Sequence, residues 1–182
     1  DGRLQKRKVS STPEDYAEAI VAGILDVLDG KNTFIDEVVH ATTVATNAIL
    51  ERRGARTAMI TTAGFRDILE LRRIRIPLSY DLEWEKPPPL AERALRFEVK
   101  ERLDNFGAVL TPLDLSGLDK IVETCISEKV AAIAVCFLHS YRNGDHERQV
   151  RDFIAPKLPG VHISLSSDIL PEVQEFERAS TT

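Results

Sequence analysis

Hydroxyl, imidazole and amide side chains gather in one short stretch, Val39-His40-Ala41-Thr42-Thr43-Val44-Ala45-Thr46-Asn47. The apolar residues before it predict a strand from Phe34 to His40 with Val38 and Val39 in the core, and a helix should follow. Ligands of open parallel sheets bind at the carboxyl ends of strands, and a helix N-terminus offers free N–H groups to an anion. His40, Thr42 and Thr43 are therefore candidates for binding an anionic reacting group. Helix capping by either threonine fits the same residues, and spacing alone favours capping.

Other residues that could take part in catalysis or metal binding indicate a function less clearly. The sequence contains no G-x-x-x-x-G-K-[ST], G-x-G-x-x-G, H-E-x-x-H or G-x-S-x-G motif. Cys125 and Cys136 lie in apolar stretches without zinc-ligand spacing, so we expect buried free thiols and no metal site. His139 follows a predicted buried strand and is interpreted as a loop histidine, whereas His146 and His162 are expected at the surface.

Composition limits the class of protein. The chain has 182 residues, of which 43% are hydrophobic, enough for one packed domain. A net charge of −5 argues against a nucleic-acid partner, which requires a basic face. No signal peptide opens the sequence, and no apolar run approaches the roughly 20 residues of a membrane span. We therefore expect a cytoplasmic protein.

Helices and strands alternate along the chain, which predicts an α/β fold with a mixed or parallel sheet and flanking helices. The nearly continuous apolar run from Val130 to Leu138 is typical of a strand buried on both faces. Further strands are expected at 4–9, 57–62 and 161–165, a hairpin at 97–110, and helices at 12–29, 42–53, 65–72, 113–129, 145–158 and 171–176.

Residues 73–96 differ from their surroundings. They contain Trp84 and the triplet Pro87-Pro88-Pro89, which cannot lie inside a helix or a central strand. We expect one domain over 1–182, with two subdomains, 1–72 and 97–182, joined by this irregular segment. A lid, a subunit interface and an ordered surface loop remain alternative roles for it.

Four segments resemble the hydantoinase A / 5-oxoprolinase family. His40 to Gly54 is similar to the family's H-G-T-T-x-A-T-N-x-[IL]-[IL]-E-R-x-G stretch, and Thr61 to Asp67 is similar to its T-T-x-G-F-x-D turn. Glu101 to Gly107 resembles its E-R-x-[DN]…G hairpin, and Ser166 to Thr182 resembles its S-x-[ED]-[IV]-x-P-E…E-[RY]-x-S-T-T segment. The matches follow the family's order and span nearly the whole chain.

This resemblance implies the N-terminal half of an actin-like, ribonuclease-H-type ATPase fold, truncated at both ends. It implies part of an ATP-dependent hydrolase of cyclic amides, a relative of acetone and acetophenone carboxylase subunits. The parent would use ATP with Mg²⁺ or Mn²⁺, and its partners would be a C-terminal ATPase domain and a hydantoinase B-type subunit. The substrate and phosphate-binding candidates become His40, Thr42, Thr43, Asn47, Arg178, Ser180 and Thr181.

Two departures from the family pattern shape the functional expectation. Ala41 stands where the family usually has glycine, and no D-x-G-G-T-x-T-D phosphate hairpin is present. We therefore expect no catalysis and no bound nucleotide or metal from this chain alone. Besides a cyclic-amide hydrolase, two alternatives remain: a subunit of an ATP-dependent ketone carboxylase, and a non-catalytic module in which residues 73–96 contact a partner subunit.

Overall fold

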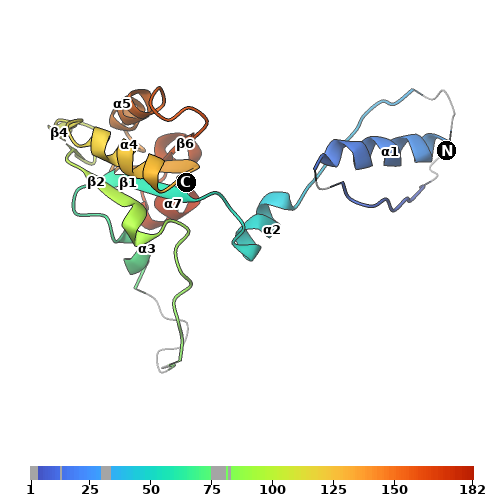
Figure 1. Cartoon of the computed structure of the whole chain (residues 1–182), viewed down its shortest axis with the longest axis horizontal. Coiled ribbons are helices and arrows are strands. Elements are labelled where there is room, and N and C mark those ends of the chain that lie inside the picture. Colours follow the sequence, from blue (N-terminus) through green and yellow to red (C-terminus); the bar gives the residue numbers. More distant parts are fainter. Residues whose placement is uncertain (1–3, 13, 30–33, 75–80, 82) are drawn as a thin grey trace. The chain divides into compact units, whose positions relative to one another are not determined.

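A computed structural model describes residues 4–12, 14–29, 34–74, 81 and 83–182 (Figure 1). The chain divides into two compact units, residues 1–44 and 45–182. The second unit contains the sheet and most of the buried residues. Within the described residues, no helix is both long and apolar enough to cross a bilayer.

The first unit contains helix α1, Tyr16–Leu28. Asp15 caps it, because its Oδ1 accepts a hydrogen bond of 2.8 Å from the Ala17 N–H. The helix predicted over 12–29 therefore begins later than expected, after Asp15. Asp29 ends the helix in the left-handed conformation, with φ 49°. Gly30, a residue type that commonly ends a helix, comes next in the sequence and lies outside the described residues.

Two predicted strands of the first unit are wrong. Residues 4–9 and 34–40 adopt no strand. Val38 and Val39, the expected core of the second strand, are 58% and 83% exposed. A strand requires a neighbour to pair its N–H and C=O groups, and the described part of this unit supplies none. His40 therefore does not follow a parallel strand, which removes the physical argument that placed it at a sheet edge.

The second unit is built on a parallel sheet in the order β2-β1-β5-β6. The strands are β1 (Thr57–Thr62), β2 (Arg96–Val99), β5 (Ala132–Cys136) and β6 (His162–Leu165). Met59 pairs with Ala134 across β1 and β5. The predicted α/β class with a parallel sheet is therefore confirmed.

Helices cover both faces of this sheet (Figure 1). Alternating residues of β1 separate the two cores, because Ala58 and Ile60 join one cluster and Met59 joins the other. The first cluster packs under α4 (Leu118–Ser127) and α5 (Asp145–Ile154). The second includes α3 (Ile68–Leu71) and α7 (Glu175–Thr181). The remaining helices are α2 (Val44–Glu51), η1 (Arg93–Leu95) and α6 (Ser166–Ile169).

The predicted hairpin is present but shorter than expected. Strand β3 (Arg102–Leu103) pairs antiparallel with β4 (Val109–Thr111). Gly107 supplies the positive φ, 89°, that the intervening turn requires. The expected strand from 97 to 103 is broken after Val99, because β2 pairs with β1 and the chain then turns to bury Glu101.

The described residues between Asp81 and Glu92 contain no helix or strand, as predicted for the proline-rich stretch. The predicted irregular segment 73–96 is nevertheless too long, because η1 and the first residue of β2 lie within it. The sheet takes β1 from before this segment and β2 from its end. The proposed subdomains 1–72 and 97–182 thus share one sheet, and their separate role in the whole protein stays a prediction.

Candidate functional site

Buried polar side chains meet where the parallel strands end at their carboxyl edge. Thr62, the last residue of β1, donates its hydroxyl proton to Glu101 Oε1 and accepts a 3.0 Å hydrogen bond from the Leu138 N–H. Glu101 Oε2 lies 2.8 Å from His146 Nδ1. All three residues are at most 5% exposed. The expectation that His146 lies at the surface is therefore wrong, because this side chain completes a buried pair.

A second carboxylate lies beneath the loops that follow β5 and β6. Glu147 is fully buried, and its Oε1 accepts from the Phe137 N–H at 2.9 Å and from the Ser166 hydroxyl at 2.6 Å. Its Oε2 accepts from the Ser167 N–H at 2.9 Å. Three donors offset the cost of removing this carboxylate from water. Glu147 therefore ties α5 to both strand ends.

Arg178, a predicted ligand-binding residue, belongs to the same assembly. It is 2% exposed. Its guanidinium donates to Ser166 Oγ at 3.1 Å, to the Glu172 carbonyl at 2.7 Å and to the Phe137 carbonyl at 2.7 Å. These contacts hold α7 against the ends of β5 and β6. We call the residues that share these bonds the edge network: Thr62, Glu101, Phe137, Ser140, His146, Glu147, Ser166 and Arg178.

The edge network satisfies its own polar groups rather than presenting them outward. Sequence reasoning found Arg178 through a motif but missed Glu101 and Glu147 as buried residues. Glu101 follows the short strand β2 and Glu147 lies in the first turn of α5, and glutamates at such positions are too common for the sequence to mark them as buried. His139 Nδ1 and Ser167 Oγ, beside the network, are buried without a hydrogen-bond partner among the described residues.

The remaining predicted site residues are not all brought together. His40, Thr42 and Thr43 lie in the first unit and are exposed. The Val44 N–H donates to Thr42 Oγ1 at 3.2 Å, so Thr42 caps α2, which was the alternative interpretation. Asn47 lies in the first half of α2 and is exposed.

Ser180 and Thr181, at the end of α7, line a cavity of about 380 Å³ in the second unit. Met59 and Ala134, paired on adjacent strands, contribute to its lining. We call it the Met59 pocket. Its other lining residues are Ile49, Arg52, Thr57, Leu69, Arg72, Pro87, Pro88, Pro89, Leu90, Ala91, Phe176, Ala179 and Thr182.

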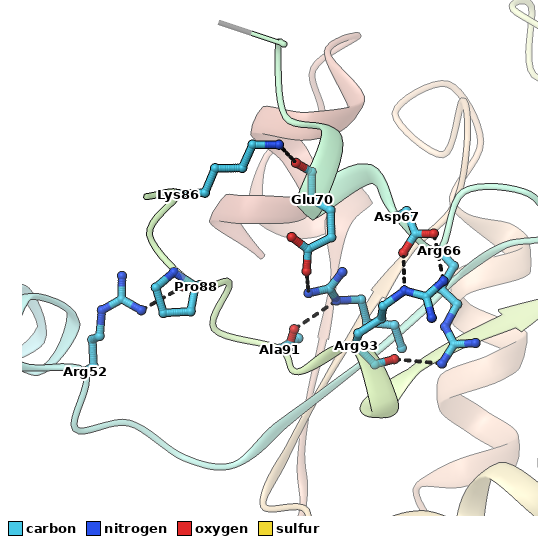
Figure 2. Close-up of polar contacts among 9 residues, drawn as sticks. Arg52, Arg66, Asp67, Glu70, Lys86, Pro88, Ala91 and Arg93 are labelled. Carbon is cyan, nitrogen blue, oxygen red and sulfur yellow. Dashed lines mark hydrogen bonds and ion pairs between the residues drawn. The ribbon is translucent and has the colours of Figure 1, made fainter. Parts of the chain in front are cut away.

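Hydrogen bonds hold the proline-rich wall of this pocket at several points (Figure 2). Arg52 Nη1 donates to the Pro88 carbonyl at 2.7 Å, and Arg96 Nε donates to the Ala91 carbonyl at 2.9 Å. Arg96 is itself anchored, because its Nη2 lies 2.9 Å from Glu70 Oε1. The triplet Pro87–Pro89 is thereby fixed by contacts on both sides.

Beside this wall, Arg93 and Asp67 form a bidentate ion pair at 2.8 and 3.0 Å (Figure 2). The hydrogen bonds from Arg93 lower the pKa of Asp67 below its ordinary value of 3.8. Arg66 Nη2 also donates to the Arg93 carbonyl at 2.8 Å. This pair lies at the surface and fixes the start of α3 to η1.

The described residues contain no cluster of three or more His, Cys, Asp or Glu side chains suited to a metal ion. Cys125 and Cys136 are free and buried, as predicted. Burial raises the pKa of Cys125 to about 11 and that of Cys136 to about 12. Neither thiol is therefore a nucleophile at neutral pH.

The chain is also similar to known proteins. A family model described as the hydantoinase/oxoprolinase N-terminal region matches residues 1–158. An uncharacterized protein of Methanocaldococcus jannaschii is 38% identical over 181 residues, covering 96% of this chain and 26% of its own length.

Two solved structures share the fold. The ATP-dependent caprolactamase from Pseudomonas jessenii superimposes with a TM-score of 0.85 and 29% identity, over 100% of this chain and 28% of that one. A nucleotide-free acetone carboxylase structure gives a TM-score of 0.84 and 26% identity, over 95% of this chain and 27% of that one. The chain thus spans about a quarter of the length of each of these three proteins.

Proposed function

Since this chain belongs to the family of the hydantoinase/oxoprolinase N-terminal region, we propose that it forms the N-terminal part of an ATP-dependent hydrolase of cyclic amides. The observation that carries the proposal is the similarity to an ATP-dependent caprolactamase along the entire chain. The shared fold supports a common structural framework for this chain and the caprolactamase. The name of that relative supports the class of reaction, the ATP-dependent hydrolysis of a cyclic amide.

The chemistry explains why such an enzyme consumes ATP. An amide is a poor electrophile, and phosphorylation of its oxygen would turn that oxygen into a leaving group. Charge on the phosphoryl oxygens must then be held by N–H donors, hydroxyl groups and a divalent cation such as Mg²⁺ or Mn²⁺. We propose that the whole enzyme binds ATP and this cation, whereas the isolated chain turns over no substrate.

We propose two sets of residues for the ligand side of the reaction. His40, Thr42, Thr43 and Asn47 would donate hydrogen bonds to substrate or phosphate, a role that rests on their match to the family motif. Ser180 and Thr181 would contribute hydroxyl groups from the end of α7. Arg178 would act indirectly, since its guanidinium already positions α7 through Ser166 and Phe137.

Substitution of Thr43 tests the first set. In the full-length enzyme, Thr43→Ala should lower turnover well beyond its effect on stability, because a hydrogen bond to the reacting group would be lost. Thr46→Ala is the matched control, since Thr46 is an exposed threonine of α2, three residues after Thr43, and is not among the proposed ligands. Equal turnover of the two variants would remove Thr43 from the site.

The similarity to acetone carboxylase supports a second candidate, a subunit of an ATP-dependent ketone carboxylase. A hydantoinase B-type partner subunit would fit either enzyme. Product analysis separates the two candidates. The full-length protein, with its partner subunit if one co-purifies, is incubated with ATP and either a lactam or a hydantoin, or a ketone with bicarbonate. Ring-opened acid supports the hydrolase, whereas a keto acid from ketone and bicarbonate would replace it with the carboxylase.

A further inference from the structure

The Met59 pocket has a lining that is apolar except for hydroxyl groups and two arginines. Arg52 and Arg72 carry the only charged side chains among its lining residues, in a chain whose net charge is −5. Arg52 donates to a backbone carbonyl, that of Pro88, and the Arg72 guanidinium carbon lies 5.8 Å from the centre of the Phe176 ring. Neither guanidinium meets a carboxylate in the part of the chain that the structure describes. The side chains that line the pocket therefore include two guanidinium groups and no carboxylate.

From this geometry we propose that the Met59 pocket binds a small monocarboxylate with a short aliphatic body. The aliphatic part would contact Met59, Leu69 and Ala134, where burial of apolar surface stabilises the complex. The carboxylate would accept hydrogen bonds from Arg52 or Arg72, because a guanidinium fork matches the two oxygens of a carboxylate. Because Ser180 and Thr181 line this pocket and are also proposed ligand residues of the hydrolase, the inference rests in part on the proposed function, but its test measures binding and not turnover.

The size and stiffness of the pocket favour a small molecule over a polypeptide segment. A volume of about 380 Å³ falls near the lower end of the range of about 300–1,000 Å³ that small-molecule pockets occupy. Pro87, Pro88 and Pro89 have fixed φ angles, and Arg52 and Arg96 bind carbonyl groups of the same wall. A wall held in this way is preorganised, which reduces the entropy lost when a ligand binds.

Met59 is the only methionine in the sequence and lines the pocket, so its methyl group is a direct reporter. The chain is labelled with [methyl-¹³C]methionine and titrated with hexanoate, with hexanamide as the neutral isostere; Met59→Leu identifies the resonance. We expect hexanoate to shift the Met59 methyl signal to saturation. Hexanamide should bind at least about tenfold more weakly, because it forfeits the charge-assisted hydrogen bonds. No shift with hexanoate, or equal affinity for the two compounds, would overturn the proposal.

Three arginine variants show where the carboxylate binds. Arg52→Gln and Arg72→Gln each remove one guanidinium, and at least one should weaken hexanoate binding about tenfold. Arg72→Gln leaves the contact between Arg52 and Pro88 in place, so it tests charge without loosening the wall. Arg53→Gln is the control, since that side chain is 83% exposed, pairs with Glu51 and does not line the pocket. Unchanged binding in both pocket variants, or equal loss in the control, would contradict the assignment.

Discussion

Glu101 and His146 lie 45 residues apart in sequence, yet the carboxylate oxygen Oε2 of the first is 2.8 Å from the ring nitrogen Nδ1 of the second. The glutamate side chain is fully buried and the histidine side chain is 7% exposed. The other carboxylate oxygen of Glu101 accepts from Thr62, whose hydroxyl also accepts from the Leu138 N–H. One carboxylate thus connects the ends of β1 and β5 to the beginning of α5.

Removing that carboxylate should destabilise the second unit. Glu101→Ala leaves His146 and Thr62 buried without their shared partner, and we expect a loss of about 2–4 kcal/mol in the free energy of unfolding. Urea denaturation followed by circular dichroism measures it. Glu123→Ala, at an exposed position in α4, is the control and should change stability by less than about 0.5 kcal/mol. A similarly small change for Glu101→Ala would show that the pair contributes little.

Substitution of Arg178 tests whether this residue stabilises the fold or contacts a ligand directly. Arg178→Met removes the donors to Ser166, Glu172 and Phe137 while keeping much of the side-chain volume. We expect the free energy of unfolding to fall by about 2–4 kcal/mol, because buried acceptors lose their hydrogen-bond donors. Thermal or urea unfolding provides the measurement, with Arg151→Met at the surface of α5 as the matched control. Normal stability combined with impaired ligand binding would instead identify Arg178 as a direct contact.

The pair formed by Asp67 and Arg93 should be visible in a pH titration. Hydrogen bonds from Arg93 lower the folded-state pKa of Asp67, so its contribution to stability is complete above the ordinary value of 3.8 and is lost as pH falls through the lower folded-state value. Carbon-detected NMR of the Asp67 carboxyl group should give a midpoint below 3.8. Arg93→Gln should raise that midpoint, and Arg151→Gln should leave it unchanged. If the Asp67 midpoint is the same in Arg93→Gln as in the unchanged protein, another group causes the lowered pKa.

The two cysteines should resist thiol reagents while the protein is folded. Burial raises their pKa values to about 11 and about 12, so almost no thiolate exists at pH 8, and neither sulfur reaches solvent freely. Reaction with 5,5′-dithiobis(2-nitrobenzoic acid) should be slow in buffer and complete in concentrated urea. Rapid labelling of either thiol in buffer would show that the core opens more readily than this packing implies.

Sequence reasoning succeeded where local pattern and tertiary environment agree. The run from Val130 to Leu138 predicted a buried strand, and β5 lies within it, because continuous apolar character suits a central parallel strand. The same reasoning failed for Phe34 to His40, where apolar residues are exposed and no strand among the described residues pairs with them. An apolar segment can form a strand, but it does so only where a neighbouring strand pairs with its backbone N–H and C=O groups.

The edge network and the Met59 pocket could not be predicted from the sequence, because both depend on contacts between distant segments. Glu101 meets His146, and Arg52 meets Pro88, only because crossover connections fold distant segments onto one sheet. Each residue type occurs commonly on protein surfaces, so its identity carries no signal of burial. The family motif did identify Ser180 and Thr181, which line the Met59 pocket.

The most direct test of the proposed function is phosphate release by the full-length protein. With ATP and Mg²⁺, addition of a lactam or a hydantoin should increase phosphate release in step with ring-opened product, because amide activation consumes the nucleotide. The 182-residue chain alone should release none above background. Ring opening that proceeds at the same rate without ATP, or ATP hydrolysis that no cyclic amide stimulates, would contradict the assignment as an ATP-dependent cyclic-amide hydrolase.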